Sequence, residues 1–82
     1  MTDLKLLNQV IKESGMTMTS IALKSGINRV TLYNRLNGIG EFTATEIMSL
    51  ANALKMSDEE RDNIFLSKKL YDIQHNNVAE VV

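Results

Sequence analysis

Apolar residues recur at helical spacing along most of the chain, and no segment shows the alternation typical of a strand. The first apolar face comprises Leu4, Leu7, Val10 and Ile11. This helix is expected to end near Ser14-Gly15, because glycine readily adopts the left-handed conformation that closes a helix. The pattern therefore predicts an all-α protein.

Two short helices are expected next, separated by a glycine. Thr17 is the expected N-cap of the second helix, which Gly26 interrupts. Asn28 is the expected N-cap of a third helix that runs from Arg29 to Leu36, and Asn37-Gly38 is a strong stop signal. A short helix, a glycine turn and a second helix in this order are typical of a helix-turn-helix.

The starts of the fourth and fifth helices carry well-defined local signals. Thr43 with Glu46, and Ser57 with Glu60, have the spacing of capping boxes, in which each side chain bonds to the other residue's backbone N–H. The apolar positions expected to face the core in these helices are Ile47, Leu50, Ala51, Leu54, Ile64 and Phe65. Together these elements predict a compact five-helix domain over residues 1–66.

Residues 67–82 are expected to form a C-terminal helix extension and tail. Leu70, Tyr71 and Ile73 would continue the last helix, with fraying beyond about residue 74, where the apolar pattern weakens. A dimer or partner interface is the alternative role for this apolar surface. His75 is expected to be a surface histidine, because nothing near it in the sequence supplies a set of metal ligands.

A chain of 82 residues, of which 44% are hydrophobic and 23% charged, has room for one domain with one modest core. It contains no cysteine, which excludes a disulfide framework and cysteine-based metal sites. The N-terminal residues lack the pattern of a signal peptide, and no apolar stretch approaches the roughly 20 residues of a membrane span. We therefore expect a cytoplasmic protein without membrane association, cofactor, metal site or catalytic residues, and not an enzyme.

The net charge of −1 argues at first against nucleic acid, because phosphate contacts need lysine and arginine. The distribution of charge changes that picture. From residue 14 to residue 40 the only charged residues are Lys24, Arg29 and Arg35, and most of the acids follow from Glu41 onward. A chain that is acidic overall can therefore present a locally positive face.

If Leu32 and Leu36 anchor the third helix to the core, its opposite side carries groups that match base edges in a major groove. Arginine pairs with guanine, asparagine pairs with adenine, and a compact apolar group packs on the thymine methyl. The residues expected on that side are Arg29, Val30, Tyr33, Asn34 and Asn37. A merely solvated face is the alternative, but it would usually carry lysine and glutamate where Val30 and Tyr33 stand.

The segment from Thr17 to Gly38 resembles the helix-turn-helix of the lambda-repressor-like family of phage repressors and Cro proteins. The run from Ile21 to Leu66 is also similar to a group of small regulators from temperate phages and prophages of Gram-positive bacteria. The motifs that carry this second similarity are Leu36-Asn37-Gly38, Glu41-Phe42-Thr43, Glu46-Ile47 and the run from Glu59 to Phe65. The resemblance implies a five-helix domain, a dimer on a pseudo-palindromic operator and transcriptional control.

The resemblance also implies which residues meet DNA. Base contacts are expected from Asn28, Arg29, Val30, Tyr33 and Asn34. Phosphate contacts are expected on the same grounds from Thr17, Met18, Thr19, Asn37 and Gly38. Beyond what the resemblance implies, Lys24, Thr31 and Arg35 are also expected to contact phosphate. Two positions depart from the family: Met18 replaces a common glutamine, and Arg35 stands where many relatives have an apolar residue, so that the core position moves to Leu36.

These features favour a sequence-specific DNA-binding transcriptional regulator, similar to phage Cro proteins and repressors, that binds double-stranded operator DNA through its third helix. Such a protein would be associated with the nucleoid when bound. A homodimer would have to use the last helix and tail. The alternative function is that of a modulator or antirepressor that binds a partner repressor protein, which the acidic C-terminal half would attract.

Overall fold

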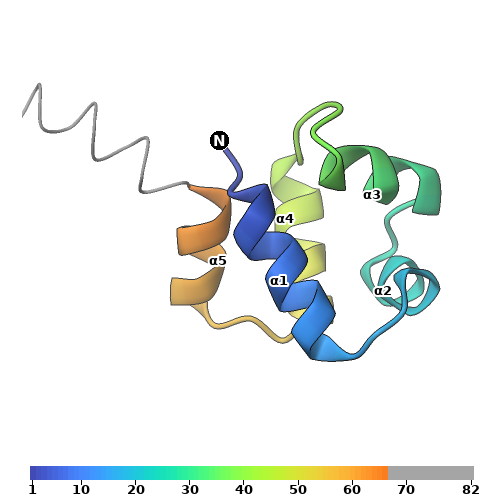
Figure 1. Ribbon diagram of the computed structural model, residues 1–82, viewed down its shortest axis with the longest axis horizontal. Helices are drawn as coiled ribbons and strands as arrows, with labels where there is room; N and C mark the ends of the chain where they lie inside the picture. The colour runs from blue at the N-terminus through green and yellow to red at the C-terminus, as the bar shows by residue number, and fades with distance from the viewer. Residues whose placement is uncertain (67–82) are drawn as a thin grey trace, which may run out of the picture.

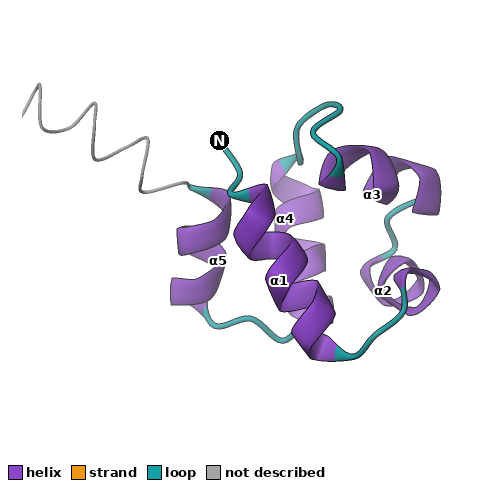
Figure 2. Cartoon of the chain, viewed as in Figure 1, coloured by secondary structure: helices purple, strands orange, loops and turns teal. Residues whose placement is uncertain are grey.

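The computed structural model describes residues 1–66, and all regular secondary structure in that range is helical (Figure 2). The five helices are α1 (Leu4–Ser14), α2 (Met18–Ser25), α3 (Arg29–Leu36), α4 (Ala44–Ala53) and α5 (Asp58–Phe65). The predicted all-α, five-helix fold is confirmed for this part of the chain. The predictions made for Leu70, Tyr71, Ile73 and His75 lie outside the described residues.

Every helix starts at a polar side chain that accepts a hydrogen bond from a free backbone N–H of the first turn. These N-cap residues are Asp3, Thr17, Asn28, Thr43 and Ser57. Thr43 and Ser57 form complete capping boxes with Glu46 and Glu60, as predicted. The caps satisfy N–H groups that have no partner inside the helix, and they account for the close agreement between predicted and observed helix starts.

The helix-turn-helix depends on the backbone conformation of Gly26. This residue ends α2 with a φ of 73°, a left-handed conformation that costs glycine little because it has no Cβ. The chain then turns through Ile27 and Asn28 and enters α3. In Figure 1, α2 is seen nearly end on while α3 lies across the view, so that the two helices cross at a steep angle.

The core lies where the five helices meet. α2 packs on α3 and α4, while α1 packs on α3 and α5 (Figure 1). The principal buried side chains are Leu7, Ile21, Ile27, Leu32, Leu36, Phe42, Leu50, Ile64 and Phe65. The rings of Phe42 and Phe65 pack edge to face with centroids 5.5 Å apart, which joins the segment before α4 to the end of α5. α3 is thus held from behind by α1 and α2.

Replacing Leu50 with alanine should lower the free energy of unfolding by about 2–5 kcal/mol, because its side chain is 0% exposed and its removal leaves a cavity. Leu23→Ala is the matched control, since Leu23 is 80% exposed and its removal should change stability by no more than about 0.5 kcal/mol. Urea unfolding of both variants measures the difference. Equal losses would contradict the assignment of the core.

Candidate nucleic-acid interface

The two sides of α3 have different surroundings. Leu32 is fully buried and Leu36 nearly so, which confirms that these two leucines anchor the helix to the core. Arg29 is exposed, as are Val30 at 68% and Tyr33 at 63%. Two large apolar side chains therefore stand in water beside an arginine, on a helix of only eight residues. Such a surface is unusual for a helix face that only contacts solvent.

The remaining polar residues of α3 lie on its flanks. Thr31 and Asn34 are half-buried, whereas Asn37, just after the helix, is exposed. The side-chain amide of Asn37 donates one hydrogen bond to the Tyr33 carbonyl at 2.8 Å. The Gly38 N–H donates to the Arg35 carbonyl at 3.1 Å, so this backbone group, predicted to contact phosphate, already has a partner within the chain.

Asn28 has a structural role at the start of α3. Its Oδ1 accepts hydrogen bonds from the N–H groups of Val30 at 2.8 Å and Thr31 at 3.3 Å. This use of the oxygen leaves the side-chain amide nitrogen, a donor, as the group that a base acceptor could meet. The predicted base contact and the observed N-cap are therefore compatible within one side chain.

The start of α2 lies beside α3 and supplies further polar groups. Thr17 and Thr19 are exposed, and the Thr17 hydroxyl accepts from the Ser20 N–H at 3.1 Å. Met18 is half-buried and packs against the core, so its backbone N–H, not its side chain, is the group suited to a phosphate. An open groove joins this end of α2 to the start of α3, lined by Thr19, Ala22, Leu23, Gly26, Ile27, Asn28 and Arg29.

The three cations of this region differ in their surroundings. Lys24 and Arg29 are exposed, and no ion pair involves either of them within residues 1–66. Arg35 is half-buried, and its Nε lies 3.5 Å from Glu46 Oε1. Its Nη1 also donates to the Ile39 carbonyl at 3.4 Å, a long hydrogen bond. Arg35 is therefore the one member of the predicted phosphate set whose charge is already shared with an acid.

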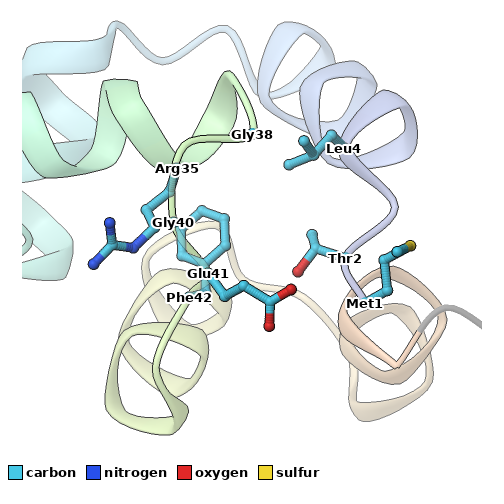
Figure 3. A pocket seen from close by; sticks show the side chains of 8 residues that line it. All are labelled: Met1, Thr2, Leu4, Arg35, Gly38, Gly40, Glu41 and Phe42. Carbon is cyan, nitrogen blue, oxygen red and sulfur yellow. The ribbon is translucent and has the colours of Figure 1, made fainter.

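A second hollow lies between the N-terminus and the segment that follows α3. Figure 3 shows its lining: Met1, Thr2, Leu4, Arg35, Gly38, Gly40, Glu41 and Phe42. The carboxylate of Glu41 extends toward Thr2 and Met1, whereas the guanidinium of Arg35 points away from them (Figure 3). A phosphate in this hollow would meet the negative charge of Glu41, so that the groove between α2 and α3 is the better candidate for contact with DNA.

Two features of this surface were not predicted from the sequence. One is the pairing of Arg35 with Glu46, which joins two helices and has no signature in local spacing. The only hint was that no acid between residues 14 and 40 could serve Arg35 as a partner. The other is the exposure of two apolar side chains beside the interface, Leu23 on α2 and Ile39 after α3.

The geometry defines a class of protein: a domain whose second and third helices form a helix-turn-helix with an exposed face free of acids. In a comparison with family models, the one described as Helix-turn-helix matches residues 7–60, about two thirds of the chain. The protein belongs to this helix-turn-helix family, which supports the predicted lambda-repressor-like membership. Comparisons with curated proteins and with solved structures gave no significant match.

Membership of this family makes the chain a DNA-binding domain of the kind that regulates transcription. Within residues 1–66 no helix is long and apolar enough to cross a membrane. In the same range no three side chains of histidine, cysteine, aspartate or glutamate gather as the ligands of a metal ion would.

Substitutions of Asn28 should separate its two roles. Asn28→Ala should lower the free energy of unfolding by about 0.5–2 kcal/mol, because α3 loses its N-cap. Asn28→Ser keeps a capping oxygen, so it should fold with nearly wild-type stability. Because it lacks the side-chain amide, it should nevertheless bind DNA less tightly than the wild-type protein. Urea unfolding and a DNA titration of both variants measure this. Wild-type affinity in Asn28→Ser would remove Asn28 from the base contacts.

Proposed function

We propose that the protein is a sequence-specific transcriptional regulator that binds operator DNA with α3 in the major groove. The observation that carries this proposal is the outward face of α3, where Arg29, Val30 and Tyr33 are exposed together without an acid among them. Burial of Leu32 and Leu36 on the opposite side fixes which face is turned outward. The family match supports the same orientation, since the second helix of the motif enters the groove.

The side chains on this face suit particular base edges. In the proposed complex Arg29 would pair with the O6 and N7 of a guanine, and Asn34 with the N6 and N7 of an adenine. Val30 and Tyr33 offer apolar surface to thymine methyl groups. The amide of Asn28 lies at the start of the same helix. These five residues are our proposed base contacts.

Phosphate contacts would surround this helix. We assign them to Thr17, Thr19 and the backbone N–H of Met18 at the start of α2, where free amides and the helix dipole favour an anion. Lys24 adds an exposed cation near the end of α2. On the other flank, Thr31 and the free amide hydrogen of Asn37 complete the set, with Gly38 beside them. These contacts would set the position of α3 without selecting a sequence.

The finer role that we propose is that of a phage or prophage regulator similar to Cro. Two copies related by a two-fold axis would place their α3 helices in half-sites about 10 base pairs apart. The homodimer would use the C-terminal part of the chain, as the sequence predicts. The domain would act on chromosomal or prophage DNA in the cytoplasm, close to the nucleoid.

A fluorescence titration tests this function. The purified protein is titrated against its own upstream DNA and against a scrambled duplex, each at two salt concentrations. Lys24 is the exposed cation of the proposed phosphate set, so each bound domain should give a slope of log K against log salt of about −1, and the upstream DNA should bind more tightly than the scrambled duplex. Absence of binding at both salt concentrations would overturn the proposal, and co-purification with a repressor would then favour the modulator.

Arg29→Ala should weaken binding to the preferred duplex by about 1–3 kcal/mol and relax the preference at one base pair. The loss follows from removal of a bidentate contact to guanine. Lys55→Gln is the control: it also removes one exposed cation, but in the turn between α4 and α5, away from the helix-turn-helix. Competition with duplexes altered one base pair at a time measures the effect. An unchanged preference would exclude Arg29 from base recognition.

A further inference from the structure

We infer that Arg35 is a positioning residue for DNA binding and not a phosphate contact. Together with Glu46 it holds residues 37–42, here called the α3–α4 loop, against the end of α3. The inference deepens the proposed function and rests on it, because its effect is measured as affinity for DNA. It differs from the sequence-based expectation, which placed Arg35 among the residues that meet phosphate.

The contacts of Arg35 join three parts of the chain. Its Nε lies 3.5 Å from Oε1 of Glu46, in the first turn of α4, and its Nη1 donates to the Ile39 carbonyl in the loop at 3.4 Å. The Arg35 and Glu46 side chains are only 24% and 20% exposed. Solvent therefore screens this pair less than it would screen a pair on the open surface.

Burial of the Arg35 Nε atom makes separation of the Arg35–Glu46 pair unfavourable. This atom is shielded from water and has no partner at hydrogen-bonding geometry, so that the carboxylate of Glu46 is the charge that offsets its desolvation. A buried donor without such a neighbour would be unfavourable. If Arg35 turned toward a phosphate, Glu46 would in turn lose its cation. Both side chains are therefore more stable in the ion pair than apart.

The loop has a matching space at Gly40. A Cβ placed on this residue would lie 2.6 Å from Arg35 Nη1, closer than such atoms approach, and the φ of Gly40 is 78°. The guanidinium thus occupies the room that a side chain would need. Arg35 and the loop fit one another at a position where only glycine leaves the arginine undisturbed.

The same loop continues the backbone of α3. The N–H of Asn37 bonds to the Tyr33 and Asn34 carbonyls, that of Gly38 to Arg35, and that of Ile39 to Asn34 at 2.8 Å. A shift of the loop therefore moves the last turn of α3, which carries Asn34. It also moves Asn37, a proposed phosphate contact. Release of Arg35 would disturb the interface without removing any group that touches DNA.

The salt dependence of binding distinguishes the two roles. A phosphate contact releases counterions, so its removal reduces the slope of log K against log salt by about 0.9. A positioning residue lowers affinity but leaves the slope unchanged. Removal of the Glu46 charge also distinguishes the two roles, because it changes the affinity in opposite directions. If Arg35 is a phosphate contact, the loss of Glu46 frees it for phosphate and strengthens binding. If Arg35 is a positioning residue, the loss of Glu46 releases the loop and weakens binding.

The experiment compares Arg35→Met and Glu46→Gln with the wild-type protein. Glutamine keeps the oxygen that accepts the Thr43 N–H, so the capping box survives while the charge is lost. Glu60→Gln is the matched control, because Glu60 holds the same position in the capping box of α5 and forms no ion pair within residues 1–66. Both test variants should bind DNA about threefold to tenfold more weakly, as expected for loss of a half-buried ion pair, with an unchanged salt slope.

Gly40→Ala tests the same contact from the side of the loop. Its Cβ would displace the Arg35 guanidinium, whereas Gly15→Ala introduces a similar left-handed strain, at a φ of 73°, with no atom within 4 Å. Gly40→Ala should reproduce the loss of affinity seen in Arg35→Met, and Gly15→Ala should leave the affinity unchanged. Equal affinities in the two alanine variants would contradict the inference.

Amide hydrogen exchange at Gly38 and Ile39 provides a measurement that needs no DNA. Arg35→Met and Glu46→Gln should both speed exchange at these amides, and Glu60→Gln should not. Unchanged exchange in both test variants overturns the inference whatever the DNA result, and so does a reduced salt slope in Arg35→Met with tighter binding in Glu46→Gln. Absence of DNA binding by the wild-type protein would instead overturn the proposed function.

Discussion

The interface depends on the burial of two leucines from α3. A helix of eight residues is too short to be stable alone in water, where isolated helices below about 12–15 residues are marginal. Leu32 and Leu36 supply the missing stability, because their side chains enter a core shared with the other helices. The same burial fixes the rotation of α3 and leaves Val30 and Tyr33 in solvent. Stability and presentation of the outward face therefore have one physical cause.

Most of the fold could be predicted from the sequence because its determinants are local. Thr17, Asn28 and Ser57 each start a helix through bonds that span only two or three residues, so that spacing alone reveals them. Gly26 is equally local, since its conformation is set by the absence of a side chain. The inward position of Leu32 follows from helical periodicity. Assignments to bases and phosphates, by contrast, stay predictions, because none of these local signals involves DNA.

What could not be predicted depends on contacts between distant elements. Periodicity placed Arg35 beside two buried leucines and gave no indication that Glu46, in the next helix, would face it. Met18 illustrates the same difficulty: it occupies the first position of α2, where a side chain can turn outward, yet it packs against the core. In short helices the periodic pattern does not define the edge of the apolar face. Whether a side chain at that edge is buried or exposed is therefore set by its tertiary neighbours.

The withdrawal of Arg35 into a pair with Glu46 bears on how such an acidic domain could select a sequence. Nonspecific binding to DNA comes mainly from released counterions and grows with the number of free cations. With Lys24 and Arg29 as the exposed cations of its helix-turn-helix, the domain should hold unrelated DNA weakly. Base contacts by α3 would then supply a larger share of the total affinity, and discrimination between sites rests on that share. An arginine that orders the interface instead of adding charge to it would favour specificity over strength.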